Sequence, residues 1–371
     1  PVSLRPAKAF VQPDPLGCIL IIGPWNYPFS LTLQPLVGAL AAGNTAVLKP
    51  SEHAPHVSSL IKKLIEKYFQ PNIAKVIEGD GNIAADLMTQ KFDHVFFTGG
   101  ENIGKKVMEA AAKNLTPVTL ELGGKSPAIV INGANLEVTA KRIIWGKSLN
   151  AGQTCIAPDH LLVEKKLFDS LITNLKISIN DFYGDTPLSS KHLGSIINQR
   201  QFNRLNNLLK RAKSNGQIIF GGECNESEKR ISPTLIRIEN RKDPLMKEEL
   251  FGPLLPILSI KNLDEAISDF KSLPKPLALY LFGGEKKEQE KILSMTSSGG
   301  VCFNDVVLQA GIPELPFGGV GSSGMGKYHG KAGFDNFTHY KSVLKRPFWL
   351  DLNFRYPPYK IDLSLLDKLI G

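Results

Sequence analysis

Two side chains in this 371-residue chain could carry out covalent chemistry, a cysteine thiol and a glutamate carboxylate. Cys155 ends the short polar segment Gly152-Gln153-Thr154-Cys155, and Glu121 opens the segment Glu121-Leu122-Gly123-Gly124-Lys125. No two cysteines have CxxC spacing, and no metal-ligand cluster accompanies the thiol. This pattern predicts a cysteine that forms a covalent adduct and a glutamate that later activates water.

The elements that must position these groups begin with a regular alternation of apolar strands and amphipathic helices. Strands are expected at residues 16–22, 45–48, 74–77, 94–97 and 118–120, and helices at 31–42, 57–69, 83–88 and 102–113. Because the strands are almost continuously apolar, both faces of their sheet must be covered. The first third of the chain therefore predicts an α/β domain built on a parallel sheet.

The pattern changes after the first third and predicts a second α/β domain. Strands are expected at residues 128–131, 217–220, 235–238, 255–260, 277–282 and 300–303, with helices at 136–147, 166–179 and 201–213. The glycine-rich residues 299–326 read as a loop that crosses back to the first domain.

Two short segments at expected strand ends are weak signals when each is taken alone. Gly99-Gly100-Glu101-Asn102-Ile103-Gly104 could hold a phosphate on backbone N–H groups, but such turns between a strand and a helix are common. Lys49-Pro50-Ser51-Glu52 could bond ribose hydroxyls, or it could be a solvated turn with a helix-capping serine.

Taken in order, the segments are far more specific, and the chain resembles the NAD(P)-dependent aldehyde dehydrogenase superfamily over nearly its whole length. The resemblance is carried by Pro24-Trp25-Asn26-Tyr27-Pro28, Lys49-Pro50-Ser51-Glu52, Phe97-Thr98-Gly99, Glu121-Leu122-Gly123-Gly124-Lys125, Gly152-Gln153-Thr154-Cys155, Glu249-Leu250-Phe251-Gly252-Pro253 and Pro316-Phe317-Gly318-Gly319. The segments Ser297-Ser298-Gly299-Gly300-Val301 and Gly324-Met325-Gly326-Lys327-Tyr328-His329-Gly330 are similar to the class 3 branch, which includes the fatty aldehyde dehydrogenases.

The resemblance implies catalytic roles for three residues. Cys155 would attack the aldehyde carbonyl as a thiolate, with its pKa lowered by a helix N-terminus or by the cofactor's positive charge. The Asn26 amide and the backbone N–H of Cys155 would stabilise the oxyanion. Glu121 would activate the water that hydrolyses the thioester. The expected reaction is oxidation of medium- to long-chain aliphatic or aromatic aldehydes to carboxylic acids.

The resemblance also implies binding roles. Cofactor contacts are expected at Trp25, Lys49, Glu52, Gly99, Gly100, Gly104, Glu249 and Phe251, and substrate contacts at Tyr27 and His329. A carboxylate at Glu52 favours NAD over NADP, although the class 3 branch often uses both. Gly100 replaces the small polar residue that family members usually carry there, which removes one hydroxyl from the phosphate turn.

The resemblance implies the aldehyde dehydrogenase-like fold, whose parts are expected in consecutive stretches of the chain. Residues 1–17 form a bridging arm, 18–121 the NAD(P)-binding domain to which 311–345 returns, 122–310 the catalytic domain, and 346–371 a C-terminal arm and tail. The bridging strands imply a homodimer. The chain starts at Pro1 without the upstream helical segment of its relatives, so we expect it to be trimmed. The tail segment 361–370 is too short to span a bilayer, though it could touch a membrane surface.

Composition and charge limit the partners and the cellular location that are expected. The net charge is +9, but the lysines are scattered and no basic block is interleaved with aromatic residues, so nucleic acid is not an expected partner. Four unpaired cysteines predict a reducing, cytoplasmic location, and no metal site or integral membrane anchor is expected. Two alternatives remain open: a coenzyme A-acylating aldehyde dehydrogenase, against which Glu121 argues, and a catalytically silent binding protein if the N-terminal segment is truly absent.

Overall fold

The computed structural model describes residues 6–270, 273–349, 351 and 356–359, and its first domain is organised around strand β2 (Cys18–Ile22). Alternate side chains of this strand point to opposite faces. Ile19 and Ile21 pack with α1 (Ser30–Ala41) and α2 (Pro55–Tyr68). Leu20 and Ile22 share the other face with side chains of α3 (Gly81–Thr89) and α4 (Glu101–Ala112). A strand buried on both faces needs the continuous apolar run that the sequence provides.

The first sheet has six strands in the order β16 (Gly324–Met325), β6 (Val118–Glu121), β5 (His94–Thr98), β2, β3 (Thr45–Lys49) and β4 (Ala74–Val76). All neighbours are parallel except β16, which pairs antiparallel with β6. The chain runs from β2 outwards to β4 and then returns to place β5 on the other side of β2. This reversal creates a crevice at the carboxyl ends of β2 and β5, where open α/β sheets bind ligands.

The second sheet has seven strands in the order β15 (Gly300–Phe303), β14 (Ala278–Phe282), β7 (Pro127–Val130), β8 (His160–Glu164), β13 (Leu254–Ile260), β12 (Thr234–Ile238) and β9 (Ile218–Phe220). Only β9 is antiparallel to its neighbour. The predicted α/β class with largely parallel sheets is therefore confirmed. The central strand β8 was not predicted, because its short apolar run follows the polar segment Pro158-Asp159-His160.

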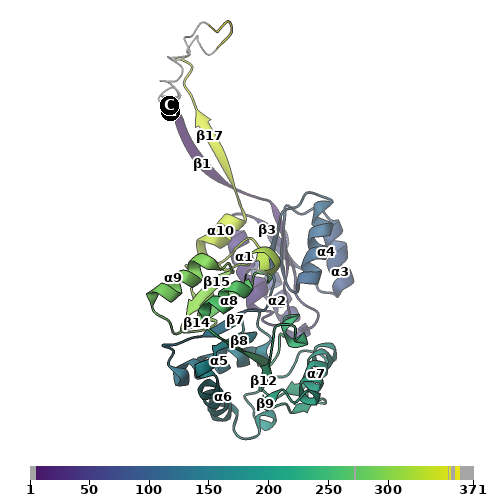
Figure 1. Ribbon diagram of the computed structural model, residues 1–371. Helices are drawn as coiled ribbons and strands as arrows, with labels where there is room; N and C mark the ends of the chain where they lie inside the picture. Colours follow the sequence, from purple (N-terminus) through teal and green to yellow (C-terminus); the bar gives the residue numbers. More distant parts are fainter. Residues whose placement is uncertain (1–5, 271–272, 350, 352–355, 360–371) are drawn as a thin grey trace.

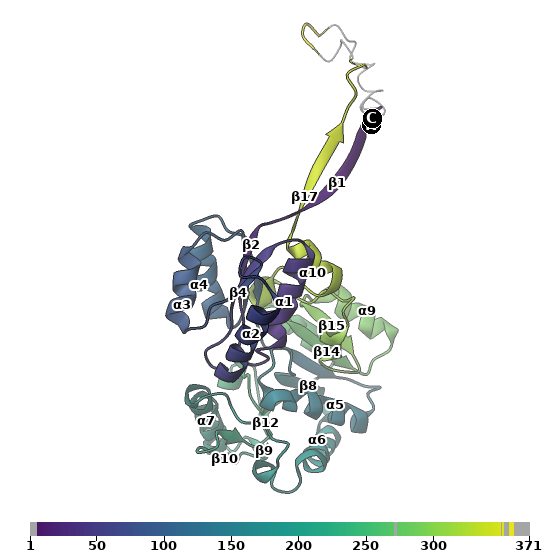
Figure 2. The same cartoon turned by 180° about the vertical axis from the view of Figure 1, so that it is seen from behind.

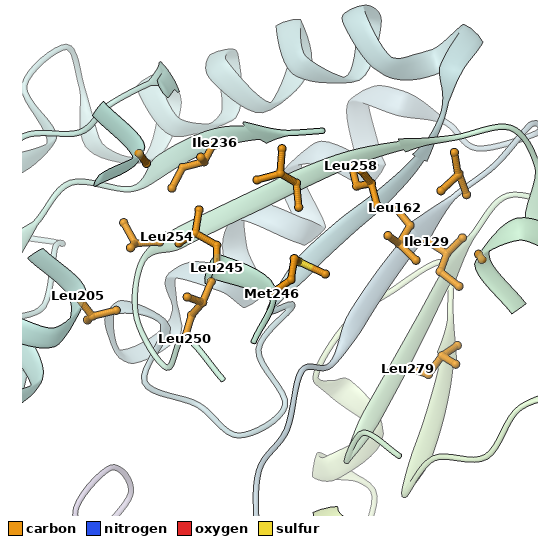
Figure 3. Packing of buried hydrophobic residues seen from close by; sticks show 14 of the residues in the cluster. Ile129, Leu162, Leu205, Ile236, Leu245, Met246, Leu250, Leu254, Leu258 and Leu279 are labelled. Atoms are coloured by element: carbon orange, nitrogen blue, oxygen red, sulfur yellow. The ribbon is translucent and has the colours of Figure 1, made fainter. Parts of the chain in front are cut away.

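Helices cover both faces of the second sheet (Figure 1). One face packs with α5 (Leu136–Ser148) and α6 (Phe168–Tyr183). The other packs with α7 (Gln199–Ser214), α8 (Leu263–Phe270) and α9 (Lys286–Met295). Figure 3 shows part of this second core, in which Leu205 of α7 lies near Leu245 and Leu250. The loop that contains Leu250 is thus anchored in the core of the second domain.

The two-stranded arm differs from the predicted boundaries. Strand β1 (Lys8–Pro15) pairs antiparallel with β17 (Thr338–Lys345), and the ribbon extends away from both domains (Figures 1 and 2). Residues 338–345 therefore lie in the arm and not in the dinucleotide-binding domain, whereas α10 (Gly330–Asn336) does return to pack on α1. Most side chains of β17 are exposed, Leu344 among them, so this strand is not packed against the first domain.

Parts of the chain for which expectations were stated lie outside the described residues. These are the first five residues of the arm and the predicted tail segment 361–370. Among the helices that the structure does describe, none combines the length and the apolar character needed to cross a membrane.

Candidate active site

Most of the predicted site residues gather at the junction of the two domains. Asn26 and Tyr27 follow β2, Lys49 ends β3, and Glu121 ends β6. Because these strands are parallel, their carboxyl ends meet at one edge of the first sheet. Hydrogen bonds from Asn26 and Tyr27 to the loop of Cys155 bring the second domain to the same edge.

The loop that precedes Cys155 has a left-handed backbone. Asn150, Ala151 and Gly152 have φ angles of 50°, 55° and 78°. A residue with a Cβ adopts this region at a cost of about 1–2 kcal/mol. At Gly152 a Cβ would lie 2.3 Å from the carbonyl oxygen of Gly252, so a larger residue would force the two segments apart. The loop is therefore bent sharply between α5 and β8 and pressed against the segment that follows Glu249.

Gln153 holds this bend through its buried side-chain amide. Its Nε2 donates to the carbonyl oxygens of Asn150 at 2.9 Å and Ser195 at 3.1 Å. Its Oε1 accepts from the backbone N–H of Ile197 at 2.9 Å. Three bonds at well-formed distances fix a side chain that is only 2% exposed. The sequence motif contains Gln153, but sequence analysis gave it no role of its own.

Asn26 and Tyr27 connect the first domain to the same bend. The Asn26 Nδ2 donates to the carbonyl oxygen of Gln153 at 3.1 Å, which leaves its second amide N–H available to a ligand. Thr154 donates its hydroxyl to the carbonyl oxygen of Leu149 at 3.3 Å. The Tyr27 hydroxyl, 2.6 Å from the Thr154 Oγ1, is therefore the donor in that pair. The two residues before Cys155 are therefore held by groups from both domains.

The surroundings of Cys155 favour the protonated thiol. Burial, followed by the charges of Glu249 and Glu121, raises its pKa to about 12. The backbone N–H groups of Cys155 and Ile156 act in the opposite direction but do not reverse the shift. The residues after Cys155 form a turn and then β8, so the helix N-terminus suggested as a source of a lower pKa is not there. The thiol must lose its proton to a neighbouring base or in the presence of an added positive charge.

Glu121 is almost completely buried at the end of β6. It is 3% exposed, and within the described part of the chain neither carboxylate oxygen has a hydrogen-bond partner. Burial raises its pKa well above the usual range of glutamate. A buried carboxylate without a protein partner can take up a proton from a small molecule that enters the site. This is the property that a general base requires.

Tyr328 lies close to both reactive groups, which sequence analysis did not anticipate. Burial raises its pKa well above the usual tyrosine value, and the charges of Glu121 and Cys155 raise it further. Its ring is 2% exposed and packs edge-on against Phe317, with ring centroids 5.7 Å apart. Tyr328 lies in the glycine-rich segment that returns from the second domain, where nothing in the sequence distinguishes it from a packed aromatic residue.

Glu249 and Phe251 lie on the opposite side of the Cys155 loop. The Glu249 carboxylate rests on the backbone of Gly123, where a Cβ would lie 2.2 Å from one of its oxygens. Burial, followed by the charge of Asp159, raises the pKa of Glu249 to about 8. The Phe251 ring meets Trp25 edge-on at 5.3 Å between centroids. Trp25, Glu249 and Phe251, which are three of the predicted cofactor residues, thus lie in one region beside the Cys155 loop.

A network of buried charges fixes the backbone that carries Glu249 and Phe251. Lys125 pairs with Asp159 and also donates to the carbonyl oxygens of Leu245 at 2.8 Å and Glu248 at 3.0 Å. Asp159 accepts from the backbone N–H of Leu250 at 2.8 Å. Burial alone would raise the pKa of Asp159, but Lys125, His160 and Lys147 together outweigh it, and the net pKa lies well below the usual range. Sequence analysis missed this network.

The Asp159→Ala variant is expected to lose about 3–5 kcal/mol of unfolding free energy, because it leaves Lys125 buried without a counter-ion. The measurement is the urea dependence of the tryptophan fluorescence. The matched control is Glu137→Ala, which removes an acid from an exposed, solvent-screened ion pair with Lys141 at 2.9 Å and should cost far less. Equal losses in the two variants would show that the buried network adds nothing to stability.

Lys49 and Glu52 form an ion pair of 2.7 Å beside the crevice between β2 and β5. The Lys49 side chain is 3% exposed, whereas Glu52 is partly open to solvent. Burial alone would raise the pKa of Glu52, but the bond and charge of Lys49, a backbone hydrogen bond and the charge of His53 together outweigh it, and the net pKa is lowered. An anchored carboxylate beside a buried ammonium can hold a diol through both of its hydroxyls.

The glycines of the turn after β5 differ in their surroundings. A Cβ at Gly99 would lie 2.5 Å from the ring of Phe97, whereas a Cβ at Gly100 would meet nothing within 4 Å. Gly100 is the N-cap of α4, so its neighbourhood is open to a ligand. Gly104 is buried, and a Cβ there would lie 2.8 Å from the side chain of Leu122. Gly104 is thus packed closely on Leu122, and the ligand contact expected there stays a prediction.

His329 lies near the Cys155 side of the junction through its packing on Phe317. The two rings are stacked, with centroids 5.4 Å apart and an interplanar angle of 27°. Its Nε2 is buried without a hydrogen-bond partner in the described residues, and burial lowers the pKa of the ring. A neutral imidazole of this kind can bond a polar group of a ligand or can simply complete the apolar wall.

Comparison with known proteins gives one consistent family. The model of the aldehyde dehydrogenase family matches residues 2–343. The chain is 48% identical to the 4,4'-diaponeurosporen-aldehyde dehydrogenase of Staphylococcus aureus, covering 97% of this chain and 78% of that protein. It is 47% identical to aldehyde dehydrogenase family 3 member A2 of Mus musculus, with 96% and 75% covered. It is 45% identical to the dimeric NADP-preferring aldehyde dehydrogenase of Rattus norvegicus, with 94% and 77% covered.

Solved structures give the same result. The substrate-bound Staphylococcus aureus AldH has a TM-score of 0.96 and 46% identity, covering 100% of this chain and 81% of that one. An aldehyde dehydrogenase of Mycobacterium tuberculosis in complex with NAD+ has a TM-score of 0.83 and 26% identity, with 94% and 74% covered. The similarity therefore extends through both domains and the arm.

Proposed function

This chain belongs to the aldehyde dehydrogenase family, and we propose on that basis that Cys155 is its nucleophile and Glu121 its hydrolytic base. The enzyme oxidises aldehydes to carboxylic acids with NAD or NADP. The observation that best supports the two assignments is the domain junction itself. There, Asn26 of the first domain is bonded to the residue two before Cys155, and the charge of Glu121 reaches the thiol. A silent binding protein would not need these groups together.

In the proposed first step, the Cys155 sulfur attacks the aldehyde carbon. A C–S bond forms, the thiol proton passes to a neighbouring carboxylate, and the carbonyl oxygen becomes an oxyanion. Glu249 can accept this proton, because burial raises its pKa to about 8, and Glu121 stays unprotonated for the later step on water. The second amide N–H of Asn26 and the backbone N–H of Cys155 are the donors that stabilise the oxyanion.

The nicotinamide, when bound, supplies the acceptor for the hydride that leaves the thiohemiacetal carbon. The acyl group then remains on Cys155 as a thioester. Glu121 removes a proton from water, the resulting hydroxide adds to the thioester carbon, and the C–S bond breaks. The carboxylic acid leaves and Cys155 regains its proton. Because Glu121 has no protein partner, a water molecule can occupy its hydrogen-bonding positions.

Four groups of residues fit a nicotinamide dinucleotide. Lys49 and Glu52 provide a paired ammonium and carboxylate for the adenine ribose. Gly100, at the start of α4, leaves open space for a phosphate. Glu249 provides a carboxylate for the second ribose, and Phe251 with Trp25 provides an aromatic surface for the nicotinamide. Glu52 would disfavour a 2′-phosphate, so we propose that NAD is preferred to NADP.

The proposed substrates are long-chain aliphatic or aromatic aldehydes. Cys155, Val307, Ala310 and Phe317 are partly buried residues that pack against the same apolar core, so aliphatic and aromatic side chains lie in the region of the thiol. Such a border favours an apolar tail next to the reacting carbonyl. A relative with 48% identity is named for 4,4'-diaponeurosporen-aldehyde, which agrees with this class.

We also propose that the enzyme works as a homodimer in the cytoplasm. A two-stranded ribbon alone is marginally stable in water, so the β1–β17 arm needs a surface to cover it. The ribbon and the residues after it expose Val11, Leu344, Phe348 and Trp349. A relative with 45% identity is named dimeric, and the four cysteines here are unpaired, as expected in a reducing compartment. Sedimentation at several concentrations tests the dimer.

The experiment that tests the proposed function measures reduced nicotinamide with a series of aldehydes of increasing chain length. We expect kcat/KM to rise with chain length and to be higher with NAD than with NADP. The product is expected to be the free acid without added coenzyme A. Turnover that required coenzyme A and released a thioester would replace the hydrolytic mechanism with acyl transfer.

A further inference from the structure

Tyr280 of β14 is completely buried and uses every hydrogen-bonding position of its phenol. The hydroxyl donates to the carbonyl oxygen of Ile156 at 2.5 Å. It accepts from the backbone N–H of Val307 at 3.3 Å and from the Gln309 Nε2 at 3.3 Å. A phenol has one donor and two acceptor positions, so this group is fully satisfied. It connects the residue after Cys155 to the loop that follows β15.

The loop that Tyr280 holds contains a strained turn. Val307 has a φ of 67° and a ψ of −36°, and the N–H of Leu308 donates to the carbonyl oxygen of Val306 at 2.7 Å. This is a γ-turn with positive φ at its centre, a rare and strained conformation. It is especially unfavourable for a β-branched residue and costs about 1–3 kcal/mol. The turn persists only because its surroundings hold it in place.

Two of the contacts that hold the turn reach other elements of the second domain. Val306 is fully buried and occupies the space beside Gly146, where a Cβ would lie 2.3 Å from its Cγ2. The other contact is the hydrogen bond from the Val307 N–H to Tyr280. The first contact fixes the start of the turn on α5, and the second fixes its centre on β14. Loss of the Tyr280 hydroxyl would leave the first contact intact.

Both segments that Tyr280 connects border the space next to the thiol. Ile156 and Gln309 line a cavity of about 220 Å³, together with Phe317 and residues of the β14 and β15 region. Val307 and Phe317 also pack in the cluster that contains Cys155. One phenolic hydroxyl is therefore bonded both to the nucleophile loop and to a wall of this cavity.

We propose that Tyr280 is a positioning residue that sets the width of the aldehyde site by tying the Ile156 carbonyl to the strained turn at Val307. The proposal rests on the proposed function, in which Cys155 is the nucleophile and the aldehyde tail lies along the wall of Val307 and Phe317. Without the hydroxyl, the Ile156 carbonyl and the Val307 N–H lose their partner, and the turn relaxes towards a conformation with negative φ.

The first test is Tyr280→Phe in the full chain, assayed with aldehydes of short, medium and long chain. We expect KM for the preferred aldehyde to rise about tenfold and the preference between chain lengths to flatten, while KM for NAD changes less than about twofold. The matched control is Tyr68→Phe, the same chemical change at an exposed position of α2. Unchanged aldehyde preference, or an equal rise of KM for aldehyde and for NAD, would overturn the proposal.

The second test is a double-mutant cycle with Val307→Gly, because glycine adopts positive φ without strain. If Tyr280 holds the strained turn, its hydroxyl matters less once the strain is gone. We therefore expect Tyr280→Phe to raise KM for the aldehyde by less than about threefold in the Val307→Gly background. Strict additivity of the two changes would contradict the positioning role and indicate two independent contributions.

Two outcomes separate this proposal from the proposed function. Activity retained by Cys155→Ala would contradict the nucleophile assignment, whatever the result at Tyr280. If Tyr280→Phe does not fold, Val307→Pro carries the test, because proline lacks the N–H that bonds Tyr280 and fixes φ at a negative value. The chain-length preference is then expected to flatten, and an unchanged preference in folded Val307→Pro would overturn the role of the turn.

Discussion

Cys155→Ala is expected to lower kcat by about 10⁴-fold or more while the protein remains folded and still binds NAD. The reason is that no other described group is placed to form the C–S bond, and removing a nucleophile from an assembled site leaves only the residual effect of its binding groups. The left-handed backbone of the loop lies before Cys155, and the side chain of Gln153 makes bonds that do not involve the thiol. The loop should therefore keep its shape in the variant.

The measurement combines steady-state formation of reduced nicotinamide with calorimetric titration of NAD. Cys224→Ala is the matched control, because Cys224 is exposed in a short hairpin of the second domain. It should retain native activity and native cofactor affinity. Turnover by Cys155→Ala at more than a few per cent of the native rate would move the nucleophile elsewhere.

Glu121→Gln is expected to separate the two halves of the reaction. Formation of the thioester does not use Glu121 as a base for water, so one equivalent of reduced nicotinamide should appear in a rapid burst. Hydrolysis should then slow by about 10²–10⁴-fold, the usual contribution of a general base. Rapid-mixing absorbance measures the burst, and mass spectrometry of the quenched protein measures the acyl group on Cys155. A control at exposed Glu109 on α4, Glu109→Gln, should show neither effect.

The pH dependence of hydrolysis follows from the burial of Glu121. Burial raises its pKa, so a larger fraction is protonated at neutral pH than for an exposed glutamate. Only the carboxylate accepts a proton from water, and hydrolysis should therefore become faster as pH rises through this elevated pKa. Because burial favours the protonated form of Glu121, its ionisation also destabilises the fold. The free energy of unfolding should therefore fall as pH rises through the elevated pKa. In Glu121→Gln the remaining slow hydrolysis should lose this pH dependence.

Much of the first domain could be predicted because its information is local. Strand β2 is a continuous apolar run, and α2 and α4 have apolar residues at helical spacing, so short windows of sequence suffice. Strand β8 was missed because its apolar run is short and follows charged and polar residues. The pairing of β1 with β17 joins the beginning of the chain to residues beyond 337, and no local pattern contains that information.

The difference between local and long-range information also explains which residues of the site could be predicted. Cys155, Glu121 and Asn26 could be named from short motifs, and the structure places them at one junction. The network around Asp159 could not be named, because Lys125 is separated from Asp159 by 34 residues and from the carbonyl of Leu245 by 120. The raised pKa of Cys155 was also not predicted. It depends on burial and on two carboxylates that come from different domains, which only the assembled fold brings together.

Because the first sheet carries Glu121 and Asn26 and the second carries Cys155, neither half of the molecule holds a complete reaction centre. A small rotation at the joint would change the position of water relative to the thioester without disturbing either sheet. Heat should therefore inactivate the enzyme before it melts the strands. The upper working temperature should then depend on how much movement the domain junction allows, and not on the stability of either hydrophobic core.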